Sequence, residues 1–475
     1  MGYLTYAIYA ILLYFGIWFF RLFYRQRKFP RGPVPYPFVG NLPTLGKEMH
    51  RKLDQLAADY GPIFTLWFAR TPIVIVSDAQ AAEEVFARNG SKFSDRPTFI
   101  NKVITKRANR LPYMNYCPEF ERKQNICAKS CLVDSQYLDK GFIWNSKSFE
   151  SKITKKSFQP SDTLKDLVMQ TMSELIYGLP MSSAKFADFN LPGNHGVFSL
   201  INATNMFRSL RLFRPGPYMK FKKYLHHREK VLQDIFKESV KECKNKPTIL
   251  SSIVNNVVNE QKDDSNLYQS ELLCSDLFLV SIEKMAATLD WMFLYFITWP
   301  EIQHHVYEEI RTSKLRDPNQ VTIEEANRIP YLRAAVYETL RLSSLSPLST
   351  VHKTNDHVTL KGHPLPKGTC VCVNLNAIHH SVKYWDEPYQ FNPARFLEGN
   401  SLKDITAIKG FFPFGQGLRK CFGEEMTLQV LTTIIANLML HFNFDVSPWH
   451  LRPSLSGTSR LILVPQVYHV SITQR

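Results

Sequence analysis

The sequence contains little cysteine and no paired CxxC spacing. Its 475 residues include eight cysteines, at positions 117, 127, 131, 243, 274, 370, 372 and 421. They are too sparse and too irregular for a disulfide framework or a zinc site, so we expect a reducing, cytosol-facing compartment. Internal repeats and low-complexity tracts are missing as well. The chain is therefore predicted to fold around an ordinary hydrophobic core.

A basic arm for nucleic acid is also missing, although the formal net charge is +16. Lys and Arg are interleaved with Asp and Glu over most of the chain. This distribution argues against a nucleic-acid partner and favours an anionic membrane surface or an acidic protein partner.

One long uncharged run stands at the N-terminus, GYLTYAIYAILLYFGIWFF. In a helix it would cover roughly 30 Å, the thickness of a bilayer's hydrocarbon core. Basic residues follow the run, in the reverse of the order found in a cleavable signal peptide. We predict a single-pass transmembrane anchor over residues 2–23, with the rest of the chain in the cytoplasm.

The remaining chain divides into a connector and one large domain. Residues 24–45 are basic and contain four prolines in FPRGPVPYPF, so they form a stiff linker. Residues 46–475 show long amphipathic helical patterns and a few short strand patterns, such as IFTLWF, PIVIVSD, TCVCVNL and SRLILVP. We predict a mainly α domain with small β-sheets.

Cys421 lies in the stretch FFPFGQGLRKCFGEE, directly before the apolar segment EMTLQVLTTIIANLML. That segment predicts a buried helix, and the helix dipole and free N–H groups at its start favour a thiolate. Gly415, Gly417 and Gly423 would let the backbone approach a flat ligand, and Arg419 can bind a carboxylate. A thiolate, a flat ligand and a carboxylate together describe haem.

The same residues resemble a known family. Phe414, Gly417, Arg419, Cys421 and Gly423 fit the signature F-x-x-G-x-R-x-C-x-G of the cytochromes P450. The resemblance implies the cytochrome P450 fold, mainly α with small β-sheets and a single N-terminal transmembrane helix. It also implies haem b as cofactor, with iron bound by the thiolate of the cysteine in the motif.

Other segments carry the resemblance along the chain, and their order is similar to that of the animal microsomal branch. Glu338, Arg341 and Arg395 match the family's buried Glu–Arg–Arg ion-pair network. KFSDRP, from Lys92 to Pro97, matches as well. Pocket walls are expected around Phe99–Met114, Phe189–Phe213 and Ser346–Val351.

The resemblance implies a haem-thiolate monooxygenase that oxidises a small lipophilic substrate with dioxygen. Its expected partners are the NADPH-cytochrome P450 reductase, with cytochrome b5 as a further electron donor. The expected location is the endoplasmic reticulum membrane, with the catalytic domain facing the cytoplasm.

One departure from the family concerns oxygen activation. VSIEKM, at residues 280–285, aligns with the family's A-G-x-E-T-T; Glu283 is retained and Lys284 replaces the key threonine. We assign both to the catalytic site. Lys284 can snorkel away from the pocket, stabilise a developing peroxide anion, or bind the iron through its neutral amine and block oxygen.

A second departure concerns the haem propionates. Where the family commonly has a Trp–Arg pair and a further Arg, this chain has Phe120, Glu121 and Gln124. Propionate binding would then depend on Arg419, with His352 as a second donor. We expect weaker haem retention than in a typical member.

Three functional hypotheses remain at this point. The first is the monooxygenase described above. The second is a P450-fold isomerase or dehydratase acting on a lipid peroxide, because such a substrate brings its own O–O bond and needs no proton-relay threonine. The third is a haem-binding protein with little catalysis.

Overall fold

The structure is a computed structural model, and it describes most of the chain from Tyr24 onward. The described ranges are 24–46, 48–97, 110–132, 157–181, 216–242, 246–260, 265–459 and 462–475, with isolated positions before residue 24. The predicted anchor, residues 2–23, thus falls mostly outside the described residues. Among the residues that are described, no helix combines the length and the apolarity needed to cross a membrane.

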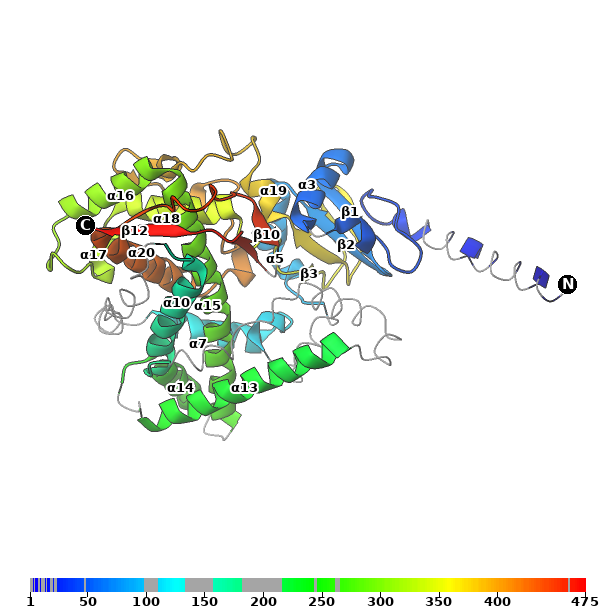
Figure 1. Cartoon of the computed structure of the whole chain (residues 1–475). Helices are drawn as coiled ribbons and strands as arrows, with labels where there is room; N and C mark the ends of the chain where they lie inside the picture. The colour runs from blue at the N-terminus through cyan, green and yellow to red at the C-terminus, as the bar shows by residue number, and fades with distance from the viewer. Residues whose placement is uncertain are drawn as a thin grey trace. The chain divides into compact units, whose positions relative to one another are not determined.

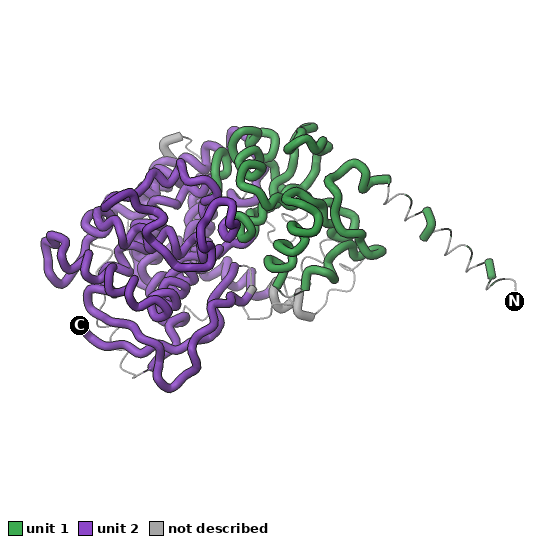
Figure 2. Tube along the Cα trace, turned by 90° about the horizontal axis from the view of Figure 1, so that it is seen from above, with its two compact units in different colours: residues 1–98, 348–378, 415–419 green, residues 99–347, 379–414, 420–475 purple. Residues whose placement is uncertain are grey.

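Two compact units make up the chain, and each is built from separate segments (Figure 2). Unit 1 consists of Met1–Thr98, Leu348–Ile378 and Gly415–Arg419, and unit 2 of Phe99–Pro347, His379–Phe414 and Lys420–Arg475. Because the segments alternate along the sequence, no linker marks the division. The expected single domain, residues 46–475, therefore contains two units of packing.

Unit 1 is organised around a four-stranded sheet with the order β1-β2-β6-β3. The two strands predicted from IFTLWF and PIVIVSD are confirmed: β1 (Ile63–Phe68) and β2 (Thr71–Val76) pair antiparallel as a hairpin. β6 (Cys370–Val373) runs parallel to β2, and β3 (His352–Lys353) closes the sheet antiparallel to β6. Two smaller strands, β4 (Val358–Leu360) and β5 (His363–Leu365), form a separate hairpin.

Short helices accompany this sheet. The longest is α3 (Met49–Tyr60); α4 (Ala79–Glu83), the π-helical turn η1 (Glu84–Arg88) and α5 (Gly90–Phe93) follow β2. Asp78 begins α4, because its carboxylate accepts the backbone N–H groups of Gln80 and Ala81 at 3.0 and 3.2 Å.

Unit 2 contains the long helices (Figure 1). They are α7 (Pro118–Cys131), α10 (Pro160–Tyr177), α13 (Gly216–Glu242), α14 (Ile249–Glu260), α15 (Ser265–Thr298), α16 (Pro300–Thr312), α18 (Pro330–Ser343) and α20 (Glu424–His441), and the short helix α17 (Ile323–Asn327) precedes α18. Four of them, α7, α10, α16 and α18, begin with proline. The ring of proline fixes φ at a helical value, and proline has no backbone N–H, a group that would find no partner in the first turn of a helix.

Small sheets complete unit 2. β9 (Phe442–Val446) pairs with β12 (Val470–Gln474), and β7 (Leu397–Glu398) pairs with β8 (Ser401–Leu402). The run SRLILVP, predicted as one strand, contributes to both members of an antiparallel pair, β10 (Gly457–Ser459) and β11 (Leu463–Pro465).

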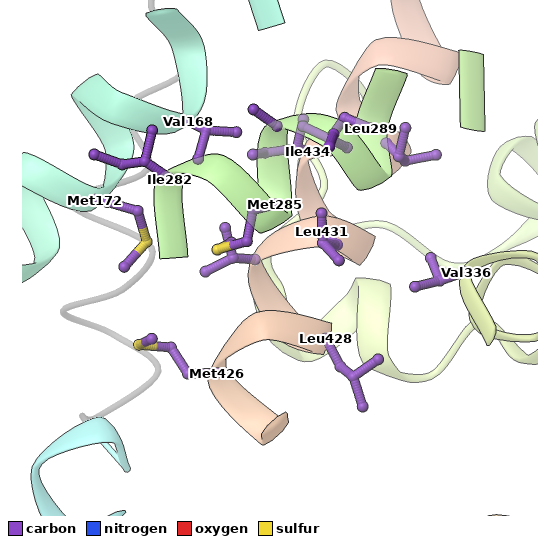
Figure 3. Packing of buried hydrophobic residues seen from close by; sticks show 14 of the residues in the cluster. Val168, Met172, Ile282, Met285, Leu289, Val336, Met426, Leu428, Leu431 and Ile434 are labelled. Atoms are coloured by element: carbon purple, nitrogen blue, oxygen red, sulfur yellow. The ribbon is translucent and has the colours of Figure 1, made fainter. Parts of the chain in front are cut away.

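The core of unit 2 forms where α15 packs against α10, α18 and α20 (Figure 3). Met285 and Leu289 of α15 lie among Val168 of α10 and Leu431 and Ile434 of α20, and all five side chains are buried. The prediction of a buried helix after Cys421 is confirmed, because α20 is buried along nearly its whole length. The mainly α prediction is confirmed as well.

Candidate functional site

Cys421 lies in unit 2, directly before the first turn of α20. The Cys421 backbone N–H donates to the Phe414 carbonyl at 2.9 Å, which closes the loop just before the helix. Seven cysteines fall within the described residues, and Cys421 is the only one of them with an exposed side chain. Burial raises the pKa of Cys370 to about 11 and that of Cys131 to about 12, so these thiols are chemically quiet.

The Cys421 thiol is accessible to solvent, although protein atoms surround it closely enough to perturb it. Desolvation raises its pKa, while the Gly423 backbone N–H and the Lys284 ammonium act in the opposite direction. A metal ion would remove the thiol proton outright. An accessible sulfur at a helix start, with an amide and a cation nearby, fits the axial thiolate of a haem iron.

Lys284 lies on α15, and its ammonium is close enough to Cys421 to affect the pKa of the thiol. Its side chain is exposed, and Val280, one turn earlier, is 47% exposed. The neighbouring hydroxyls are already engaged: Ser281 Oγ donates to the Phe278 carbonyl at 3.0 Å, and Thr288 Oγ1 donates to the Lys284 carbonyl at 2.8 Å. At position 284 this helix therefore carries an ammonium group, where the family has the hydroxyl of a threonine.

Glu283 points toward a different neighbour. Its carboxylate pairs with Lys165 Nζ of α10 at 3.0 Å. Adjacent residues of a helix point about 100° apart, so Lys284 can act on Cys421 while Glu283 packs toward α10. The side chains of these two candidate catalytic residues therefore have different neighbours, Lys165 for Glu283 and Cys421 for Lys284.

The glycines of the cysteine loop have unequal roles. Gly417 has φ +65°, and a Cβ there would lie 2.0 Å from the Phe86 carbonyl oxygen, so its close approach to backbone requires glycine. Gly415 also has positive φ, but nothing lies within 4 Å of its added Cβ. Gly423 has φ −94°, which any residue adopts, so its contribution is the N–H near the sulfur.

A basic cluster lies in unit 1, where Arg419 ends a short 3₁₀ turn, η6 (Gly417–Arg419). Arg419 donates from Nε and Nη2 to the Ser94 carbonyl at 3.0 and 2.6 Å, and Arg96 Nη1 donates to the Val351 carbonyl at 3.1 Å. The charges of Arg96 and Arg419 both lower the pKa of His352, so the two cations lie within electrostatic reach of its ring. Such a cluster fits a carboxylate such as a haem propionate.

His352 is a weaker propionate donor than the sequence predicts. Desolvation, followed by the charges of Arg96 and Arg419, lowers its pKa to about 3, so it is neutral. Its Nδ1 lies 3.0 Å from the Phe93 carbonyl, to which it donates its proton, and Nε2 then carries a lone pair. Arg96 is the cation that sequence reasoning missed; its place in KFSDRP was the available signal.

Helix α7 carries the substituted propionate positions. Phe120 is buried, Glu121 accepts a hydrogen bond from the Tyr116 hydroxyl, and Gln124 donates to the Lys420 carbonyl at 3.2 Å. Lys123 points inward, 2% exposed, and pairs with Glu119 at 2.8 Å. Gln124 thus contacts the residue that precedes Cys421.

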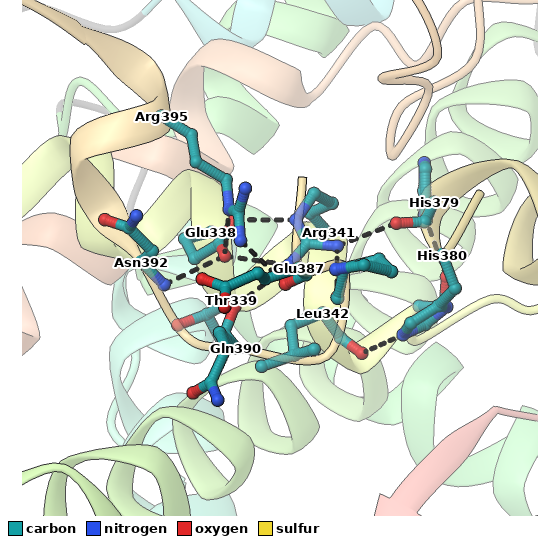
Figure 4. A network of polar contacts seen from close by, with 12 residues as sticks. Glu338, Thr339, Arg341, Leu342, His379, His380, Glu387, Gln390, Asn392 and Arg395 are labelled. Carbon is teal, nitrogen blue, oxygen red and sulfur yellow. Dashed lines mark hydrogen bonds and ion pairs between the residues drawn. The ribbon is translucent and has the colours of Figure 1, made fainter. Parts of the chain in front are cut away.

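The Glu–Arg–Arg network is assembled in unit 2 (Figure 4). Glu338 and Arg341, both on α18, form a bidentate pair, and Arg395 Nε donates to Glu338 Oε1 at 3.2 Å. Arg341 also donates to the His379 and Pro388 carbonyls at 2.7 and 2.8 Å. The network therefore ties α18 to the segment that leads toward the cysteine loop.

Comparison with known proteins extends these findings to nearly the whole chain. The family model described as "Cytochrome P450" matches residues 30–471. Pluviatolide synthase of Sinopodophyllum hexandrum is 28% identical over 92% of this chain and 90% of its own length. Steroid 17-alpha-hydroxylase/17,20 lyase of Peromyscus leucopus is 26% identical over 94% of this chain and 92% of its own.

A solved structure described as "Zebra fish cytochrome P450 another structure with Abiraterone" has the same fold. It is 22% identical, with a TM-score of 0.74, and the match covers 90% of this chain and 99% of that one. The cofactor of the family is haem with a cysteine thiolate ligand. This chain belongs to the cytochrome P450 family and is a haem-thiolate oxidoreductase.

Proposed function

We propose that the chain is a membrane-bound monooxygenase in which Cys421 binds the haem iron and a small lipophilic substrate is oxidised by dioxygen. The observation that carries the proposal is the state of Cys421. Among the described cysteines it alone is exposed, and its sulfur lies at the start of α20 near the Gly423 N–H. Electrons would come from NADPH-cytochrome P450 reductase, with cytochrome b5 as a further donor.

The chain's own residues would hold the cofactor. When bound, haem with an axial thiolate supplies an oxidant able to attack C–H bonds. Cys421 would provide the thiolate, and Arg419, two residues earlier, would bind a propionate together with Arg96. Glu121 and Gln124 would supply no cation of their own to a propionate.

Lys284 would supply a positive charge near the site that would hold the haem. Lys284 opposes the desolvation that raises the pKa of Cys421, so its ammonium lies within electrostatic reach of the thiol. A cation in that place would stabilise negative charge that develops as oxygen is reduced, without donating through a hydroxyl relay. Glu283, paired with Lys165, would be directed toward α10.

The second candidate is an isomerase or dehydratase acting on a lipid peroxide. The hydroxyls that flank Lys284, those of Ser281 and Thr288, both donate to backbone carbonyls. A reaction that needs no proton relay would tolerate this arrangement. The third candidate, a haem-binding protein with little catalysis, is the outcome if neither activity is found.

We also propose a location for the protein. Residues 2–23 would anchor the chain in the endoplasmic reticulum membrane in a single pass, with the catalytic units facing the cytoplasm. The uncharged run and the basic residues that follow it support this orientation.

The test begins with the ligand. Cys421→Ser should abolish the red-shifted Soret band that a thiolate-bound haem shows after reduction and addition of carbon monoxide. Cys117→Ser is the matched control, because Cys117 precedes α7 at a capping position that serine suits. An unaltered band in Cys421→Ser would overturn the proposal.

Two activity assays then separate the functions. NADPH consumption with reductase and a lipophilic substrate supports the monooxygenase. Turnover of a lipid hydroperoxide without reductase supports the isomerase or dehydratase. Haem-loaded protein that shows neither activity supports the third candidate.

A further inference from the structure

The turn that follows strand β9 presents large apolar side chains to solvent. The His450 backbone N–H donates to the Ser447 carbonyl at 3.2 Å, which closes a tight turn with Trp449 at its corner. Trp449 is 75% exposed, and Leu451, directly after the turn, is 95% exposed. A single exposed apolar residue needs no explanation, but a tryptophan and a leucine exposed together indicate a binding surface.

The base of this turn is fixed by buried and stacked groups. Ser447 is fully buried, and its Oγ lies 2.9 Å from His450 Nδ1. The Ser447 backbone N–H donates to the His469 carbonyl at 3.4 Å, and the rings of His450 and His469 stack with their centroids 3.7 Å apart. Trp449 is therefore displayed on an anchored turn, so less conformational entropy is lost when its surface binds.

Two further exposed apolar side chains lie on segments next to the turn in the sequence or in the fold. Leu455 is 43% exposed and stands between the turn and β10, and Val467 is 71% exposed and stands two residues before the stacked His469. Together with Trp449 and Leu451, they are the only large apolar side chains exposed among the described residues from α20 to the C-terminus. We call these four residues the C-terminal apolar group.

The charge of the segment that carries this group has one sign. Residues 446–475 contain no Asp or Glu, although they contain three arginines. Arg452, next to Leu451, is exposed and forms no ion pair with any residue that the structure describes. The acidic residue that precedes the segment, Asp445, accepts a hydrogen bond from a neighbouring side-chain amide at 2.8 Å. An uncompensated cation beside aromatic and aliphatic side chains is typical of segments that bind anionic lipid surfaces.

We propose that residues 447–455 contact the surface of an anionic lipid bilayer, with Trp449 and Leu451 inserted at the level of the headgroups and Arg452 beside lipid phosphates. Tryptophan suits this level because its ring is largely apolar and its N–H can bond to water or to a headgroup. Arginine binds a phosphate through paired N–H groups. The contact is additional to the predicted anchor, and it depends neither on that anchor nor on the monooxygenase activity.

A second copy of this chain suits the turn less well. In a twofold contact the same surface meets itself, so Arg452 of one copy would lie near Arg452 of the other. Residues 446–475 supply no carboxylate that could separate the two cations, and like charges brought together at an interface oppose binding. An anionic bilayer offers the opposite charge, and its soft surface adapts to a protruding turn.

The experiment reconstitutes the full-length, haem-loaded protein into vesicles of phosphatidylcholine and phosphatidylserine, with or without bromine on the acyl chains near the headgroups. Bromine quenches tryptophan fluorescence only at close range. The difference in emission between wild type and Trp449→Phe isolates Trp449, because every other tryptophan is shared. Brominated vesicles should reduce this difference by at least about twofold relative to vesicles of the same composition without bromine.

Val382→Trp in the Trp449→Phe background is the matched control. Val382 is 81% exposed in unit 2, but it stands between residues of both charges, next to Lys383 and four residues before Asp386. Brominated lipid should leave the emission of this new tryptophan unchanged. Circular dichroism of each variant checks that it is folded.

The charge of the turn is tested separately. Arg452→Glu should reduce the bromine quenching of Trp449 by at least about twofold, and wild type in vesicles of phosphatidylcholine alone should show a similar reduction. Arg452→Lys keeps the charge and should keep the quenching.

Quenching that is absent from wild type, that is equal in Val382→Trp, or that survives both Arg452→Glu and the removal of phosphatidylserine would overturn the proposal. An emission shift of Trp449 that follows the protein-to-lipid ratio, without bromine quenching, would show that protein covers the turn and would also overturn it. The carbon monoxide spectrum reports the proposed function independently. Quenching without the thiolate band would overturn the monooxygenase alone, and the band without quenching would overturn the lipid contact alone.

Discussion

Arg341 donates to both carboxylate oxygens of Glu338, from Nε at 2.7 Å and from Nη2 at 2.8 Å, and both side chains are fully buried. Arg395 and the Asn392 backbone N–H add further hydrogen bonds to Glu338 Oε1, at 3.2 and 3.0 Å. The remaining Arg341 donors reach backbone carbonyls such as that of His379. Each charge is therefore satisfied only while the whole network is present.

Removing the carboxylate charge should destabilise the protein strongly. Glu338→Gln leaves the buried Arg341 guanidinium without its anion, and we expect a loss of about 3–5 kcal/mol in the free energy of unfolding. Arg395→Gln is the comparison, because Arg395 is partly exposed and its loss should cost about 1–2 kcal/mol. Urea titration followed by circular dichroism measures both. Equal costs for the two variants would contradict this account.

The two left-handed glycines of the cysteine loop provide a matched pair. Gly417→Ala places a methyl group against the Phe86 carbonyl oxygen, so it should cost about 3 kcal/mol or more and reduce haem incorporation. Gly415→Ala meets no neighbour and should cost about 1 kcal/mol from its positive φ alone. Haem content per protein and the urea midpoint report the difference. If Gly415→Ala lowers stability and haem content as much as Gly417→Ala does, the positive φ alone, and not the contact with Phe86, accounts for the loss.

Lys284 should influence the reactivity of Cys421 in haem-free protein. Lys284→Met removes a cation that lowers the pKa of the thiol, so less thiolate is present at pH 8 and alkylation by iodoacetamide should slow by about threefold. Lys284→Arg keeps the charge and should keep the rate. Peptide mass spectrometry separates Cys421 from other cysteines. An unchanged rate of Cys421 alkylation in Lys284→Met would show that Lys284 does not influence the thiol.

Haem retention tests the basic cluster of unit 1. Arg96→Gln and Arg419→Gln should each speed the transfer of haem to apomyoglobin by about tenfold, because each removes a cation from the propionate site. Arg88→Gln is the control, since Arg88 is an exposed arginine of the same unit that pairs with Glu83. Wild type itself should lose haem faster than a relative with the usual Trp–Arg pair. Retention unaffected by Arg96→Gln would leave Arg419 as the propionate cation.

His379 should make stability depend on pH. Its Nε2 accepts from the Phe412 backbone N–H at 3.2 Å, and its Nδ1 lies 2.8 Å from Ser344 Oγ. Desolvation, with the charges of His380 and Arg341, lowers its pKa well below the ordinary value. Since the folded pKa lies below the unfolded value of about 6.5, the unfolded chain binds the proton first, and stability present above that pH is lost as pH falls.

The variant His379→Gln isolates this contribution. Between pH 4.5 and 6, the slope of unfolding free energy against pH should fall by up to about 1.4 kcal/mol per unit, the effect of one proton. A slope remains in the variant, because His352 also has a pKa lowered to about 3. Urea titrations at a series of pH values measure both slopes. Identical slopes would show that His379 titrates normally.

The parts of the site that sequence reasoning found depend on residue types at fixed spacing. Cys421 before an apolar helix, and Glu338 three residues before Arg341, are local patterns, and local patterns fix the face of a helix or the start of one. The helical domain and the β1–β2 hairpin follow from periodicity in the same way. These features were predictable because each lies within a few turns of one segment.

The remaining features depend on which segments meet. Glu283 and Lys284 are neighbours in the sequence, and only the packing of α10 beside α15 decides which of them faces Lys165. Arg110 and Asp276 are 166 positions apart, so no local pattern predicts their pairing. The neutral state of His352 depends on burial, which sequence position does not reveal.

Helix α15 runs from Ser265 to Thr298 without interruption, and its sequence contains neither glycine nor proline. At that length it measures roughly 50 Å, and sharp kinks in helices occur at proline, at glycine and serine pairs, or at π-bulges. The segment between Asp276 and Lys284 has no such hinge, since Ser281 stands where the family has glycine. This part of the helix therefore has no hinge residue, so a movement of the backbone at Lys284 would have to include the neighbouring turns of α15.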